Sequence, residues 1–189
     1  EQEGIAADIT TLAKGLGAGY QPIAALMAAE NVIRMIKNGS GTLWNGHTYM
    51  SHAIATAGAL AVQQVIEEEN LLTDVRTRGE QLRNGLQVRL SQNPHVGNIR
   101  GRGLFWTVEL VQDRTTKQPF NAKLGLAPKV REIALDLGLM CYPSQGCADG
   151  TQGDHVLLAP AYTSTRKEIE TICDLITQAI ETALTGLEA

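Results

Sequence analysis

Helical periodicity over two neighbouring stretches constrains what this chain can fold into more than any other feature of its sequence. Between Ser51 and Ile66, apolar and small residues recur at helical spacing, namely Ala53, Ile54, Ala57, Ala61, Val65 and Ile66. In the second stretch Val75, Leu82, Leu86 and Leu90 share one helical face, and Pro94 ends the pattern because proline lacks a backbone donor. The two stretches predict a helical bridge between two regions of the chain.

Strand and helix patterns alternate after this bridge. Residues 104–111 are rich in strand formers, and the glycines of "RGRG" at 100–103 provide backbone freedom just before them. A helix is predicted over 127–137, and it opens with Pro128, which is tolerated in a first turn because its missing N–H would be unpaired there.

Two short strands and a final helix complete this pattern. Apolar runs at 139–142 and 156–158 predict strands on either side of the loop "PSQGCADGTQGD". Thr165 and Glu168 form a capping box, after which Ile169, Ile172, Cys173, Ile176 and Ile180 fall on one helical face. The alternation indicates an α/β or α+β domain over about 71–189.

The first 50 residues differ from the rest. They carry glycine-rich turns and short apolar runs, with too few strands to close a hydrophobic core. We therefore expect that the chain starts inside a domain, and that a missing partner completes that domain.

Composition excludes several functional classes. The chain has 189 residues, 19% of them charged, and its net charge of -4 offers no field for nucleic acid. The uncharged run at 15–29 is short and broken by glycine and proline, so we expect no membrane insertion. Three cysteines without a CxxC pair, and a start without a signal-peptide pattern, predict a cytoplasmic protein with free thiols and no metal site.

Lys14 stands in a segment that suits covalent chemistry. The segment "TLAKGLGAGYQP" surrounds it with glycine and alanine, and no other charge lies between Ile9 and Ala29. A lysine amine attacks a carbonyl only when neutral, whereas its ordinary pKa of about 10.4 keeps it protonated at pH 7. Apolar surroundings or Schiff-base formation would remove that charge, and nearby glycines would let a cofactor approach.

The segment allows two other interpretations. Most lysines are solvated surface groups, and Lys14 could be one of them. The glycines of "GLGAG" alternate strictly, which matches neither the dinucleotide fingerprint nor the phosphate loop with its GK[ST] ending.

The segment "DITTLAKGLGAGYQPIAALMA" at 8–28 closely resembles the region around the Schiff-base lysine of class III pyridoxal-phosphate-dependent aminotransferases. The resemblance continues, in the order of the family, through "NGHTYMSHAIATAGALA" (45–61), "NIRGRGLFWTVELV" (98–111) and "GDHVLLAPAYTSTRKEI" (153–169). Essentially the whole chain is covered.

The resemblance implies an α/β fold, the C-terminal part of the aspartate aminotransferase-like fold of pyridoxal-phosphate-dependent transferases. Residues 1–70 would be the end of the large cofactor-binding domain with the start of the interdomain helix, and 71–189 the small α/β domain. Lys14 would bind pyridoxal 5'-phosphate as a Schiff base and then move the proton between the substrate carbon and the cofactor.

The resemblance also implies a phosphate site at "GHTY" (46–49). Thr48, with His47 beside it, would reach across the interface of a homodimer to the cofactor phosphate. A capping role for Thr48 and Ser51 at the helix that follows is the alternative. His47 and His52 lie five residues apart, which matches no metal-binding spacing, and surface or capping roles are the expectation for both.

The family's remaining site residues precede its lysine by a long distance. They include the aspartate that pairs with the pyridinium nitrogen, the aromatic ring that stacks on the cofactor and most of the phosphate loop. We therefore expect a partner, the N-terminal half of the same enzyme, and an inactive isolated fragment.

The implied reaction is transamination of an amine or ω-amino acid with an oxoacid acceptor. The alternatives are an aminomutase (isomerase) or decarboxylase on the same scaffold, or a non-catalytic assembly fragment. Two positions depart from the family's carboxylate clamps: Leu157 stands where ornithine-type members have arginine, and Tyr142 where amine-accepting members have a mobile arginine. Arg166 is a candidate for binding the substrate instead, and a surface role is the alternative, because it lies in the first turn of the predicted helix.

Overall fold

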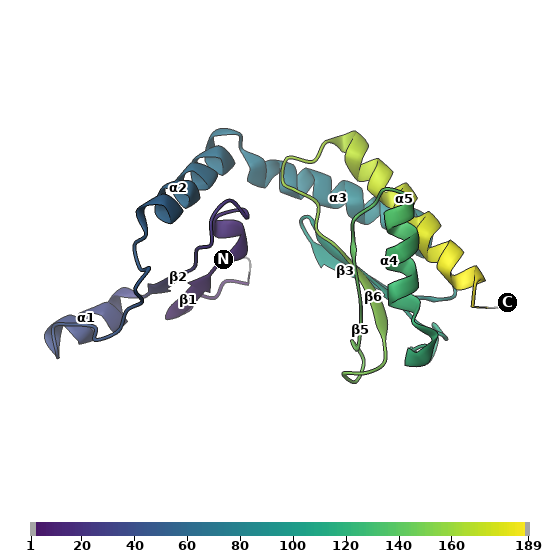
Figure 1. The fold of residues 1–189 in the computed structure, drawn as a ribbon, viewed down its shortest axis with the longest axis horizontal. Helices are drawn as coiled ribbons and strands as arrows, with labels where there is room; N and C mark the ends of the chain where they lie inside the picture. The colour runs from purple at the N-terminus through teal and green to yellow at the C-terminus, as the bar shows by residue number, and fades with distance from the viewer. Residues whose placement is uncertain (1–2, 188–189) are drawn as a thin grey trace. The chain divides into compact units, whose positions relative to one another are not determined.

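The computed structural model describes residues 3–187, which divide into two compact units with the boundary between Asn70 and Leu71 (Figure 1). At this boundary α2 (Ala53–Glu68) ends and α3 (Leu71–Leu90) begins, so the predicted bridge is two helices. Asn70, between them, has a left-handed backbone with φ of 52°. None of the helices in the described part of the chain is long and apolar enough to cross a membrane.

In its described residues, the first unit contains two short paired strands, a 3-10 turn and two helices. Strands β1 (Ile9–Leu12) and β2 (Ala25–Ala28) are antiparallel, with Ile9 opposite Ala28. The 3-10 turn η1 (Lys14–Leu16) follows β1, and α1 (Glu30–Asn38) follows β2.

Little of the first unit is buried. Within residues 3–70 only Gly17, Ala55 and Ala59 are buried, whereas the side chains of Trp44 and Tyr49 are 89% and 82% exposed. The prediction that this region closes no core of its own is confirmed.

The second unit contains an antiparallel sheet in the order β3-β4-β6-β5. Its strands are β3 (Val96–Arg102), β4 (Phe105–Leu110), β5 (Tyr142–Gln145) and β6 (Asp154–Leu158). The strands predicted at 104–111 and 156–158 are confirmed as β4 and β6. The backbone freedom expected from "RGRG" is found at Gly103, which has φ of 55°, although residues 100–102 lie inside β3. The strand predicted at 139–142 was wrong in its bounds, because β5 begins only at Tyr142.

Helices cover one face of this sheet. α3 packs on β3 and β4, α4 (Leu126–Asp136) packs on β5 and β6, and α5 (Arg166–Thr185) packs on both helices. The short turn η2 (Ala122–Leu124) leads into α4. Pro128 lies in the first turn of α4, as predicted, and the capping box of Thr165 with Glu168 opens α5.

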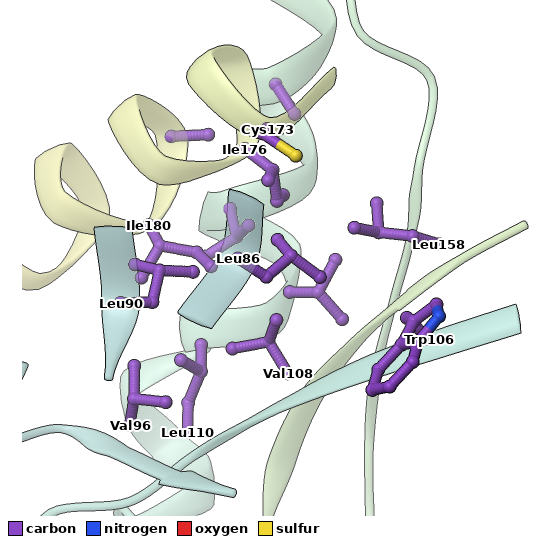
Figure 2. Close-up of a cluster of buried hydrophobic side chains, with 14 of the residues drawn as sticks. Leu86, Leu90, Val96, Trp106, Val108, Leu110, Leu158, Cys173, Ile176 and Ile180 are labelled. Carbon is purple, nitrogen blue, oxygen red and sulfur yellow. The ribbon is translucent and has the colours of Figure 1, made fainter. Parts of the chain in front are cut away.

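A continuous hydrophobic core lies between the sheet and the helices. Figure 2 shows side chains of α3, α5 and the strands converging there, among them Leu86, Leu90, Ile176, Ile180, Val108 and Leu110. Trp106, Val108 and Leu110 alternate along β4 with residues of the other face, as expected for a half-buried strand. The opposite face of the sheet is left partly exposed by the described residues.

The core depends on a close approach between α3 and the hairpin that joins β3 to β4. A Cβ atom at Gly79 would lie 2.3 Å from the carbonyl oxygen of Gly103. That oxygen also accepts a hydrogen bond of 2.7 Å from the Trp106 indole, and Gly103 has φ of 55°. A side-chain rotation could not relieve this contact, because the atom that the Cβ of residue 79 would meet is the backbone carbonyl oxygen of Gly103.

We predict that Gly79→Ala lowers the free energy of unfolding by about 1–3 kcal/mol through overpacking. In an unconstrained helix the same change would raise it by about 0.4–1 kcal/mol. Urea unfolding followed by tryptophan fluorescence measures the difference, because Trp106 is buried in the folded unit whereas Trp44 is already exposed. Asn84→Ala, at an exposed position of the same helix, is the control, and equal stability of the two variants would contradict the prediction.

Asp154 is a buried carboxylate that caps a helix from a neighbouring strand. Its Oδ1 accepts a hydrogen bond of 3.1 Å from the backbone N–H of Ala127, in the first turn of α4. The N-cap position of α4 is Gly125, which has no side chain to do this. Burial raises the pKa of the Asp154 carboxyl, and the bond from Ala127 opposes this shift without cancelling it.

The raised pKa predicts a pH-dependent stability. The folded state holds the Asp154 proton more tightly than the unfolded state, so stability falls as pH rises from the unfolded pKa through the folded pKa, with a limiting slope of about 1.4 kcal/mol per pH unit. Asp154→Asn should therefore gain stability relative to the wild type between pH 4 and pH 7. Urea unfolding at several pH values measures this gain, and Asp136→Asn, at an exposed site, should not share it.

Candidate functional site

Lys14 lies directly after β1, in a turn with an uncommon backbone conformation. It is the first residue of η1 and has φ of 51°, a left-handed value that residues other than glycine seldom adopt. Ala13 before it is extended. Such strain persists only where the surrounding contacts fix it, and it is concentrated at functional sites.

Contacts from three directions hold this turn. Within it, the N–H groups of Leu16 and Gly17 donate to the carbonyls of Ala13 and Lys14, at 3.1 and 3.2 Å. Gly17 is buried so closely against Ile23 that a Cβ atom there would lie 2.8 Å from the Cγ2 atom of Ile23.

The third contact comes from α2. The side-chain amide of Gln63 donates a hydrogen bond of 3.2 Å to the carbonyl of Leu16. On the same helix, Gly58 approaches the other end of the loop, where its Cβ would lie 3.0 Å from the Cγ atom of Gln21. The loop that carries Lys14 is therefore docked on α2 at two points.

Lys14 itself is exposed to solvent. The sequence led us to expect an amine kept dry by its glycine and alanine neighbours, and the described residues do not provide that burial. The reason is geometric, since Gly15 and Gly19 have open space around them and cover nothing. Any desolvation of this amine has to come from polypeptide or cofactor outside the described residues.

The second predicted element, "GHTY", forms a turn before α2. The N–H of Met50 donates to the carbonyl of His47 at 2.9 Å, and Ser51 has φ of 59°. Thr48 and His47 are exposed, and neither side chain makes a hydrogen bond to any other described residue, Lys14 included.

The alternative role for this turn is wrong. The residue that caps α2 is His52, whose Nδ1 accepts a hydrogen bond of 3.3 Å from the N–H of Ala55. Thr48 and Ser51 do not cap the helix. The hydroxyl of Thr48 is therefore free of that task and available to a ligand.

The side chains in this unit fit a phosphorylated aldehyde. Lys14 offers an accessible primary amine on a fixed turn, which is the group that condenses with an aldehyde. Thr48 offers an accessible hydroxyl donor just before the N-terminus of a helix, where backbone N–H groups favour an anion.

Leu157 and Tyr142 stand where the family resemblance predicts arginines, and they lie next to each other on the exposed face of the second unit's sheet. Leu157 of β6 is paired with Tyr142 of β5 on one side and with Thr107 of β4 on the other. Leu157 is half-buried and Tyr142 is exposed. Arg166, the first residue of α5, is exposed, and its backbone carbonyl accepts a hydrogen bond from Gln81.

Gln63 is not among the residues predicted for the site. A signal was nevertheless present, because Gln63 follows Ala55 and Ala59 at intervals of four and so lies near the face of α2 that those alanines bury. A polar residue on a face of small buried residues indicates a specific hydrogen-bond partner.

Comparisons with known proteins agree on one family. The family profile described as aminotransferase class-III matches residues 1–180. An aminotransferase of Gibberella zeae is 44% identical over 185 residues, which are 97% of this chain and 36% of that protein.

Solved structures give the same result. A transaminase from the marine bacterium Virgibacillus has a TM-score of 0.90 at 32% identity, over 97% of this chain and 41% of its own. An amine transaminase from an uncultivated Pseudomonas species, in its pyridoxal-phosphate-bound form, has a TM-score of 0.81 at 33% identity, over 95% of this chain and 38% of its own. The chain thus spans about two fifths of the length of these relatives.

Proposed function

Since the chain belongs to the class III aminotransferases and shares the fold of their pyridoxal-phosphate-dependent transaminases, we propose that it takes part in amino-group transfer. The reaction would run between an amine or ω-amino acid and an oxoacid, within a longer or reassembled protein. The observation that carries this proposal is the accessible amine of Lys14 on its left-handed turn.

Lys14 has two tasks in this proposal. Its Nζ would hold the cofactor through the aldehyde carbon, with loss of water, and once the substrate amine has displaced it the freed neutral amine would move the proton at the substrate carbon that carries the nitrogen. A flexible four-carbon amine suits both tasks. Pyridoxal phosphate, when bound, supplies the electron sink that makes this carbon acidic.

Thr48 and His47 would bind the cofactor phosphate. In a homodimer with the site at the interface, these residues would serve the partner's site, which accords with the absence of a hydrogen bond between Lys14 and either of them in the described residues. The exposed Trp44 and Tyr49 on the same segment support a protein-covered surface.

A further polypeptide would complete the site. The relatives are much longer than this chain, and the first unit buries little by itself. We propose that the region corresponding to the N-terminal half of the relatives covers Lys14 and contributes the partner of the cofactor's ring nitrogen. The 189-residue chain alone would then be inactive. The cytoplasmic location remains a prediction.

We predict that, in the complete protein, borohydride fixes the mass of pyridoxal phosphate on Lys14. Lys14→Ala should lose the yellow colour of the bound cofactor and lower turnover by about 10²–10⁴-fold, because the proton carrier is removed. Mass spectrometry and single-turnover absorbance measure both effects. Lys37→Ala, an exposed lysine of α1, is the control.

Colour and full activity in Lys14→Ala would overturn the proposal. Turnover by the wild type without an oxoacid would instead support an aminomutase or decarboxylase. A colourless wild-type protein that still assembles would support the non-catalytic role.

The pair Leu157 and Tyr142 bears on the substrate. An arginine binds a carboxylate through two parallel hydrogen bonds, and neither position provides one. We propose that the substrate is an amine or ω-amino acid whose far end is not held by an arginine fork.

Leu157→Arg tests this proposal. The variant should gain about 10-fold or more in kcat/KM for donors with an α-carboxylate over the matching simple amines, as expected from a new charge-assisted hydrogen bond. His155→Arg, two residues earlier on the same face of β6, should show no such gain. Equal selectivity in Leu157→Arg and the wild type would contradict the proposal.

A further inference from the structure

We infer that Gln63 is a positioning residue that holds Lys14 in its left-handed conformation from the neighbouring helix. The inference concerns the backbone of residues 14–17 and rests on the proposed role of Lys14 only for its functional meaning. Gln63 lies 49 positions after the lysine, and its side-chain amide joins α2 to this turn by donating a hydrogen bond to the Leu16 carbonyl.

The conformation of Lys14 needs support from outside the turn. A left-handed backbone at a lysine is less favourable than the ordinary right-handed or extended forms, because Cβ crowds the backbone. The bonds from Leu16 to Ala13 and from Gly17 to Lys14 are internal to the turn and would move with it. These two bonds fix the shape of the turn but not its orientation relative to α2.

Gln63 fixes the turn to a regular element. α2 runs from Ala53 to Glu68, and the side chain of Gln63 reaches from its third turn to the Leu16 carbonyl. That carbonyl belongs to the last residue of η1, two positions after Lys14. A hydrogen-bond donor at this point limits rotation of the turn. It thereby limits the direction in which the Lys14 side chain extends from the backbone.

The surrounding contacts make a single hydrogen bond effective. Gly58, one and a half turns earlier on α2, lies against Gln21, and Gly17 is wedged against Ile23. The far end of the loop is thereby already close to α2. Only the lysine end needs an additional tie, and Gln63 supplies it.

The chemistry of the side chain also fits this role. The partner is a carbonyl oxygen, which requires a donor, and the glutamine amide donates without bringing a charge next to the amine of Lys14. A glutamate would face the carbonyl with an acceptor. The adjacent Gln64 makes no hydrogen bond to another described residue, so it offers a control of identical type on the same helix.

The test compares Gln63→Met with Gln64→Met in the complete protein, freed of cofactor before the measurements. Methionine keeps the length and the helix propensity of glutamine and removes the donor. Nuclear magnetic resonance reports the HN–Hα coupling of Lys14, which depends on φ, and the exchange rate of the Gly17 N–H. Labelling with pyridoxal phosphate and borohydride reports the reactivity of Lys14 relative to Lys37.

In Gln63→Met the coupling of Lys14 should change, and exchange at Gly17 should become about 2–10-fold faster, as expected for the loss of one partly exposed hydrogen bond. The ratio of label on Lys14 to label on Lys37 should change with it. Gln64→Met should match the wild type in all three readouts, and global unfolding should be the same in both variants because the bond is exposed.

The outcomes separate this inference from the proposed function. If Gln63→Met leaves coupling, exchange and labelling unchanged, Gln63 does not position the lysine, whatever Lys14 does in the complete enzyme. If Gln63→Met loosens the turn but Lys14 carries no cofactor in the complete protein, the positioning inference holds and the proposed function fails.

Discussion

The docking of the Lys14 loop on α2 is the interaction on which the candidate site depends. The first unit has almost no buried side chains, so hydrophobic burial cannot hold the lysine in place as it holds the residues of a core. A few specific contacts do so instead, namely the bond from Gln63, the approach of Gly58 to Gln21 and the wedge of Gly17 against Ile23. Their combined effect has to exceed a backbone strain of about 1–3 kcal/mol at Lys14.

The second unit is stabilised in a different way. One face of its sheet shares a continuous core with three helices, and the tight contact of Gly79 with Gly103 fixes the distance between α3 and the β3–β4 hairpin. Because the hydrophobic core lies on that face of the sheet, substitutions on the opposite face need not disturb folding. The side chains of Leu157, Tyr142 and Thr107 lie on that opposite face.

Sequence patterns predicted the elements that are governed by local rules. The periodicity of 53–66 and 75–90 gave α2 and α3, and the capping box gave the start of α5. Strand β3 was missed because its sequence, "VGNIRGR", has two glycines and two arginines, and its strand conformation comes from pairing with β4. The strand at 139–142 was misplaced because Leu139 is buried as part of the core, whereas β5 contains Pro143, which an edge strand tolerates.

The candidate site was predictable only in its chemistry. The composition around Lys14 indicated a reactive amine, but its left-handed φ depends on contacts from α2, 49 positions away at Gln63, and no local pattern contains that information. The adjacency of Leu157 and Tyr142 likewise depends on the register of β5 against β6, and the sequence placed this strand too early.

Because Lys14 is exposed, the described residues can orient its amine but cannot remove it from solvent. A lysine can be made reactive by orientation or by loss of water, and these requirements are physically separate, since one is a matter of backbone geometry and the other of dielectric surroundings. The described residues provide orientation, through a strained turn tied to a helix, while leaving the amine in solvent.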